Sequence, residues 1–173
     1  MKFLFFIFIF ISNISAHPHT FIEVHPTLHV ENSKFSTIKF KWVLDDMTST
    51  ILIMELDTNA NGVIDKIEND YIEKEYFSMF KDYSYYTYIK VNKKSTPPLS
   101  PKNFKATIEN NKLCYSFEIQ GEYDVKNTYI EFGDSDYYVA MVLKKEFVHV
   151  KGAEVIVKGV DNDFYYGYSL GFK

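Results

Sequence analysis

The sequence lacks arginine and has a single cysteine, and both shortages narrow the range of functions. All 19 basic residues of the 173-residue chain are lysines, and 23 acidic residues bring the formal net charge to −4. Nucleic-acid-binding proteins and polybasic membrane-surface proteins usually carry a basic face, so this balance argues against both classes. One cysteine excludes an intrachain disulfide and a cysteine-based zinc cluster.

Long apolar runs are also lacking, except at the N-terminus. Lys2 precedes nine apolar residues, 3–11, and a short stretch of small and polar residues then ends at Ala16. Nine apolar residues are too few to span a bilayer, which needs about 20. The pattern is typical of a secretory signal peptide over residues 1–16, the alternative being a buried N-terminal strand. No later run reaches transmembrane length, so we expect no transmembrane segment in the mature chain.

The mature chain, 17–173, is expected to be one periplasmic domain. The lysine-only basic set and the abundant asparagine suggest an AT-rich bacterial genome, which makes the compartment the periplasm. A chain of this length can bury a sufficient core without disulfides.

Aromatic residues are frequent, and strand-like segments dominate the chain. Aromatic residues make up 18% of the sequence and only 7 glycines are present, which favours strands. Residues 19–31 alternate between apolar and polar side chains, and residues 35–44 are their expected hairpin partner across a turn at 32–34. Pro26 places the first strand at a sheet edge or a bulge.

A helical hairpin interrupts the strands. Asp46 is the expected N-cap of a helix over 47–56, and a second helix is expected over 66–80, with Ile72, Tyr76, Met79 and Phe80 on its apolar face. The remaining segments read as strands. The predicted fold class is therefore α+β: a mainly antiparallel, sandwich-like β domain with an EF-hand-like hairpin inserted at about 46–81.

The loop between these helices, DTNANGVIDKIE at 57–68, fits the twelve-residue EF-hand pattern. Calcium takes six to eight hard oxygen ligands, and alternate loop positions deliver them while a glycine allows the sharp bend. The alternative is a solvated turn between two helices. Three carboxylates and a single such loop indicate a structural calcium of modest affinity rather than a signalling site. The predicted calcium ligands are Asp57, Asn59, Asn61, Val63 (through its carbonyl), Asp65 and Glu68.

Four of the five histidines fall between His17 and His29. His19, Glu23, His25 and His29 share one face of the first strand, where neighbouring side chains lie about 7 Å apart. Imidazole suits zinc, nickel, cobalt and copper, but Pro18 has no N–H for a copper chelate built on backbone amides. The alternative is a polar strand face that carries histidine incidentally. The candidate transition-metal ligands are His17, His19, Glu23 and His25, and the candidate metals are zinc, nickel and cobalt.

Five segments carry a family resemblance: HPHTFIE at 17–23, FKWVLDDMTS at 40–49, the loop at 57–68, YYTYIKVN at 85–92 and DSDYYVAMV at 134–142. Over nearly the whole mature chain they resemble the bacterial periplasmic domain-of-unknown-function family one thousand and seven, labelled a component of an uncharacterised ABC-type transport system. The resemblance implies an accessory role in transition-metal handling beside an inner-membrane metal permease. It assigns His17, His19 and Glu23 to the family's motif, and His25 and His29 lie outside it.

Two functions follow. The first is a periplasmic metal-binding accessory protein of a zinc, nickel or cobalt transport system, with a calcium-binding loop. The second is a calcium-stabilised structural or interaction module without a transport role. No Ser/His/Asp elbow, nucleophilic cysteine motif or phosphate loop is present, so we do not expect an enzyme.

Overall fold

The computed structural model describes residues 19–136, 138–161 and 166–173. The predicted signal peptide, 1–16, and His17 lie outside these ranges. Among the described residues, none of the helices combines the length and apolar character needed to cross a membrane.

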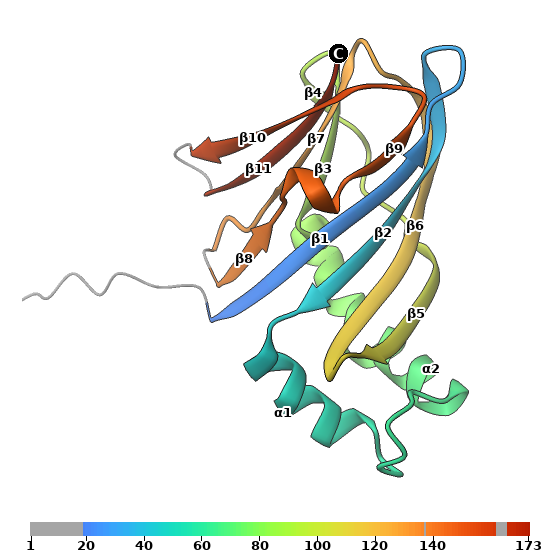
Figure 1. Cartoon of the computed structure of the whole chain (residues 1–173), viewed down its shortest axis with the longest axis vertical. Helices are drawn as coiled ribbons and strands as arrows, with labels where there is room; N and C mark the ends of the chain where they lie inside the picture. Colours follow the sequence, from blue (N-terminus) through green and yellow to red (C-terminus); the bar gives the residue numbers. More distant parts are fainter. Residues whose placement is uncertain (1–18, 137, 162–165) are drawn as a thin grey trace, which may run out of the picture.

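The first of two β-sheets is built around the predicted N-terminal hairpin (Figure 1). Strands β1 and β2 pair antiparallel, with Val24 opposite Trp42, and the turn between them places Asn32 and Ser33 at positive φ. The sheet order is β5-β6-β2-β1-β8, with β9 also paired to β1. The strand bounds are β1 Thr20–His29, β2 Lys34–Leu44, β5 Lys102–Glu109, β6 Lys112–Asp124, β8 Val139–Val142 and β9 His149–Lys151.

The second sheet has the order β10-β11-β7-β3-β4, and the pairings between its described strands are all antiparallel. These five strands all come from the C-terminal half of the chain. Their bounds are β3 Thr87–Val91, β4 Lys94–Ser95, β7 Thr128–Gly133, β10 Val155–Asp161 and β11 Tyr166–Phe172.

The fold is α+β, rich in sheet and mainly antiparallel, as predicted, but the first sheet also contains parallel pairings. Strand β1 runs parallel to β8 at Thr20–Glu23 and parallel to β9 at Thr27–His29. Residues 24–26 fall between these two partners, and this interruption accommodates Pro26, which has no N–H to donate.

The two sheets share one core. Phe40 of β2 meets Phe132 of β7 with ring centroids 6.0 Å apart, and Phe35 of β2 meets Phe172 of β11 at 5.3 Å. Trp42 is fully buried and packs edge-on against Phe117 of β6. The predicted inward face of β1 is confirmed, because Ile22, Val24, Leu28 and Val30 are all buried.

A helix–loop–helix follows β2, with α1 at Asp46–Leu56 and α2 at Lys66–Glu75. The cap of α1 is Asp45 rather than Asp46: its side chain accepts from the Thr48 amide at 2.9 Å. The second helix ends at Glu75 rather than residue 80, because Phe77 turns into the core and stacks on Phe104, 4.4 Å between ring centroids.

The segment after α2 is a 3₁₀ stretch, η1, at Phe77–Tyr86. A shorter one, η2, spans Lys145–Phe147. Ile72 is fully buried as predicted, and Tyr76 and Phe80 pack against the core, but Met79 is 58% exposed and does not belong to the buried face.

Two polar side chains tie the helices to the first sheet. Ser49 of α1 is fully buried; its hydroxyl accepts from the Leu113 amide of β6 at 3.0 Å and donates to the Leu44 carbonyl at 3.0 Å. Asn69 of α2 accepts from the Ala106 amide of β5 at 2.7 Å. Each helix that flanks the loop at 57–68 is therefore tied to the first sheet by one hydrogen-bonded side chain.

Candidate functional site

The loop between α1 and α2 wraps around the side chain of its first residue. The Asp57 carboxylate is buried and accepts from the amides of Asn61, at 3.1 Å, and Gly62, at 2.8 Å. Gly62 has φ +78°, a left-handed conformation that glycine adopts without steric cost. The bend that the sequence predicted at position six of the loop is present.

The two asparagines shape the middle of the loop. The side-chain oxygen of Asn59 accepts from the Asn61 amide at 3.1 Å, and that of Asn61 accepts from the Val63 amide at 2.8 Å. Asn59 also donates to Asp65 across the loop at 3.2 Å. These short-range bonds link alternate residues of the loop to one another.

The end of the loop is a capping box for α2. Asp65 accepts from the amides of Ile67 and Glu68, and the Glu68 carboxylate accepts from the Asp65 amide at 2.9 Å. Glu68 also accepts from the amide and the hydroxyl of Thr58, each at 2.8 Å. These hydrogen bonds, the one from Asp65 first, hold the pKa of Glu68 below its usual value, so this carboxylate stays ionised.

The donor set of the loop suits a hard cation. Among the described residues, no lysine or histidine forms an ion pair with Asp57, Asp65 or Glu68. No three His, Cys, Asp or Glu side chains in the described ranges converge enough to hold a metal by themselves. An ion here would therefore also draw on the side-chain oxygens of Asn59 and Asn61 and on the Val63 carbonyl, which are ligand types that calcium accepts.

The histidine-bearing face of β1 forms as the alternation predicted. Glu23 and His25 lie side by side on the outer face, with 3.6 Å between Glu23 Oε2 and His25 Nε2. His19 stands at the start of the strand, where its ring lies 6.0 Å from that of Tyr138. Of the four candidate transition-metal ligands, the structure brings Glu23 and His25 together, and His17 lies outside the described residues.

The surroundings of His25 were not predicted. The Phe147 ring of η2 stacks on its imidazole at 4.2 Å between centroids, and His25 Nε2 is buried without a hydrogen-bond partner. Burial lowers the pKa of His25, and Lys41 and His149 lower it further, although Glu23 opposes the shift. The lowered pKa favours the neutral imidazole, which is the form that binds metals, but its Nε2 is buried.

Two carboxylates that sequence reasoning missed hold the start of β1. Asp45 accepts from the Phe21 amide at 2.8 Å as well as capping α1. Asp134 is buried and accepts from the amides of Asp136, Tyr138 and Val139 at 3.0, 3.1 and 2.9 Å. The ordered Tyr138 carbonyl then receives the His19 amide at 2.9 Å.

These contacts join three of the sequence segments noted above. HPHTFIE is fastened at Phe21 by the aspartate of FKWVLDDMTS, and at His19 by the backbone of DSDYYVAMV. The signal available in the sequence was the presence of an aspartate in each of these segments. Which backbone amides each aspartate binds could not be predicted from the sequence.

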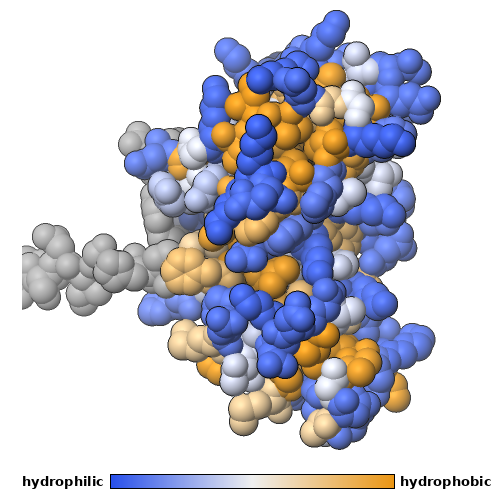
Figure 2. All heavy atoms as spheres, in the orientation of Figure 1, coloured by the Kyte–Doolittle hydropathy of each residue, from blue (hydrophilic) through white to orange (hydrophobic). Residues whose placement is uncertain are grey.

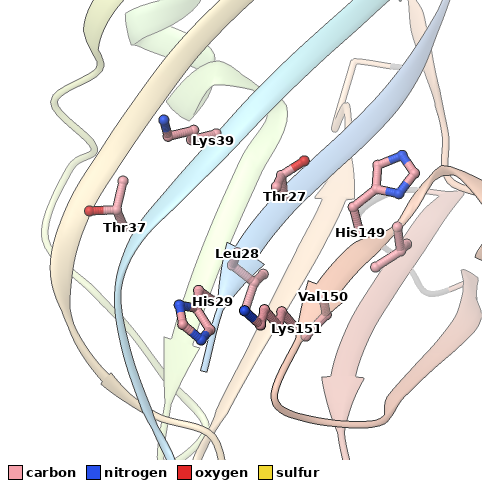
Figure 3. Close-up of a pocket in the computed structure, with 9 residues that line it drawn as sticks. Thr27, Leu28, His29, Thr37, Lys39, His149, Val150 and Lys151 are labelled. Carbon is pink, nitrogen blue, oxygen red and sulfur yellow. The ribbon is translucent and has the colours of Figure 1, made fainter. Parts of the chain in front are cut away.

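A hollow of about 620 Å³ lies further along the same face of β1, toward its end (Figure 3). His29 of β1 and His149 of β9 both line it, but their imidazoles stand apart in the close-up and do not point toward each other. Lys39, one of its two lysines, pairs with Glu118 at 3.3 Å. The hollow brings no third ligand to Glu23 and His25.

Comparison with known proteins finds relatives whose names state no function. An "Uncharacterized protein" of Haemophilus influenzae is 29% identical over 143 residues, which is 77% of this chain and 66% of the relative, so the match spans just under two-thirds of that protein. An "Uncharacterized 15.5 kDa protein in trpE 3'region" of Spirochaeta aurantia is 29% identical over 97 residues, 54% of this chain and 69% of the relative. The model of the family described as "Protein of unknown function (DUF1007)" matches residues 2–161, and the chain belongs to that family.

Proposed function

We propose that this protein binds one calcium ion in the loop at 57–68. The observation that carries the proposal is the folding of the loop around Asp57. The buried Asp57 carboxylate accepts hydrogen bonds from the amides of Asn61 and Gly62. Each carboxylate oxygen has two lone pairs, so accepting one amide leaves capacity for a cation. The ligands are Asp57, Asn59, Asn61, the Val63 carbonyl, Asp65 and Glu68.

The expected affinity is modest. Positions three and five of the loop are asparagines rather than aspartates, so only three ligands carry charge. Fewer charged ligands weaken calcium binding toward the range of extracellular modules, about 10⁻⁴–10⁻³ M. The bound ion would fix the position of α1 relative to α2, and its role would be structural.

Isothermal titration of the full mature chain with calcium tests this proposal. The wild type should bind one ion, and Glu68→Gln should weaken binding by about 100-fold, or about 2.7 kcal/mol, because it removes a charged ligand. Glu73→Gln on the exposed face of α2 is the matched control and should bind like the wild type. Equal affinity in Glu68→Gln would overturn the site.

We propose as a second function that the N-terminal histidines bind a transition metal. The supporting observation is that Glu23 and His25 already lie 3.6 Å apart on the face that His19 shares. His17 and His19 would complete the set for zinc, nickel or cobalt. The role would be that of a periplasmic accessory protein that passes the metal to an inner-membrane permease, supported by the leader pattern at 1–16 and by the family resemblance.

Titration with zinc and nickel tests this second function. A His17→Ala/His19→Ala variant should lose most of the affinity, whereas His29→Ala, a histidine on the same strand outside the set, should keep it. Unchanged affinity in the double variant would contradict the metal site. The protein would then be a calcium-stabilised interaction module, in which chelation with EGTA lowers the melting temperature and zinc has no effect.

A further inference from the structure

Helix α1 presents two apolar faces, and only one of them is used by the fold. Its inner side packs on the first sheet through Leu56 and the buried Ser49. On the outer side, Met47, Ile51 and Met54 are 64%, 58% and 81% exposed. We call these three residues the α1 stripe. Their spacing of four and three residues places them on one side of the helix.

An exposed apolar stripe of this kind is unusual on a protein surface that contacts only water. Helices that are apolar on all sides are normally covered on all sides. Contiguous apolar surface on a protein commonly marks a place where another molecule binds. Figure 2 shows apolar surface, tan and orange, over the lower part of the molecule where Figure 1 places α1.

The helical segment that carries the stripe, residues 46–75, is strongly acidic, although Asp46 beside Met47 pairs with Lys112 of β6 at 3.4 Å. Residues 46–75 contain eight acidic residues and two lysines, whereas the rest of the chain contains fifteen acidic residues and seventeen lysines. Both lysines of the helical segment are already paired, Lys66 with Asp70 and Lys74 with Glu75. The segment therefore has a net charge of −6, and one bound calcium ion would leave it clearly negative.

This charge selects among the molecules that could cover the stripe. In a two-fold dimer the same patch meets itself, which would bring two acidic segments together. The negative surface potential of an anionic membrane would repel it as well. A polypeptide segment with lysines or arginines around its apolar residues is complementary in both respects.

We propose that the α1 stripe is a docking surface for an amphipathic, basic segment of a partner protein. The apolar side chains of that segment cover Met47, Ile51 and Met54, and its cationic side chains lie against the acidic residues of the helical segment. Spaced apolar anchors of this type are the usual means by which proteins hold an amphipathic helix. This docking role does not depend on the proposed transition-metal function.

The test uses a labelled helical peptide of leucine and lysine, with leucine confined to one face. Its binding to the full mature chain is followed by fluorescence anisotropy in millimolar calcium. Ile51→Gln/Met54→Gln should weaken binding by about tenfold or more, since hot-spot side chains each contribute at least that much. Tyr166→Gln, which removes an exposed aromatic residue on the other sheet, is the control and should bind like the wild type.

Two further measurements keep the proposal falsifiable. Met54→Gln alone alters the most exposed residue of the stripe and should give part of the loss even if the double variant folds poorly. A peptide with the same lysines but glutamine for leucine should bind much more weakly. Equal binding by that peptide, or unchanged binding by the single and double variants, would overturn the proposal. So would a wild-type dimer in sedimentation that Ile51→Gln/Met54→Gln converts to monomers, because the stripe would then bind a second copy.

Discussion

The calcium-type loop and the histidine strand are both candidate metal sites, but they are built in opposite ways. The loop at 57–68 is made by hydrogen bonds between residues at most ten apart in the sequence. The start of β1 is held by Asp45, 24 residues from Phe21, and by the backbone that Asp134 orders, more than 100 residues away. A local site can form from its own sequence, whereas a site on a strand depends on how the rest of the chain packs.

The first test of this difference is a substitution at Asp134. Asp134→Ala removes a buried acceptor from three amides, and charged hydrogen bonds of this kind make the expected loss about 3 kcal/mol of unfolding free energy. Urea denaturation measures the loss, with the exposed Asp136→Ala as the control. Calcium affinity should be unchanged in the folded variant. A change in calcium affinity would show that the two regions are not independent.

The converse test perturbs the calcium loop instead of the start of β1. Calcium at about 100 times its dissociation constant should stabilise the wild type by about 2.7 kcal/mol, which raises the melting temperature by roughly 5–10 °C. Asp57→Ala should abolish this calcium-dependent rise, and Asp82→Ala, an exposed acidic residue outside the loop, should retain it. A full rise in Asp57→Ala would contradict the assignment of the ligands.

Asp45 lies where the two regions meet. Asp45→Ala removes the cap of α1 and the acceptor of the Phe21 amide, and we expect a loss of about 2 kcal/mol. Asp46→Ala, the neighbouring exposed residue, should change stability by less than about 0.5 kcal/mol. Urea denaturation of both variants decides which aspartate is the cap, and equal effects would contradict the structure.

The smallest effect concerns the pH dependence of His25. Its pKa in the folded chain is lowered from 6.5, chiefly by burial, so the unfolded chain takes up this proton at a higher pH than the folded chain does. Stability should therefore fall as the pH drops below about 6.5, and the contribution is absent above it. His25→Gln should show a shallower decline than the wild type when both are unfolded in chelator at a series of pH values. Parallel curves would rule out this coupling.

Much of the first sheet could be predicted from the sequence. Alternation over residues 19–31 identified the buried face of β1, and the turn residues identified its antiparallel partner, because both signals are local. The parallel pairing of β1 with β8 and β9 could not be predicted, because alternation does not specify which distant strand pairs or in which direction. The same limit applies to Phe147, which covers His25 from more than 100 residues away.

The helices show a second limit of sequence reasoning. Apolar spacing continued beyond Glu75, so the predicted helix was five residues too long. The aromatic side chain of Phe77 instead fills the core as the backbone tightens into a 3₁₀ turn. The exposure of Met47, Ile51 and Met54 was likewise hidden, because an apolar residue in a helix is usually assigned to the core.

The most direct test of the calcium site is a crystal structure of residues 17–173 grown in calcium, with the ion located by its anomalous signal. The proposed arrangement predicts one peak inside the loop, about 2.3–2.6 Å from oxygens of Asp57, Asn59, Asn61, Asp65 and Glu68 and from the Val63 carbonyl. An empty loop at saturating calcium, or a peak held by other residues, would contradict it.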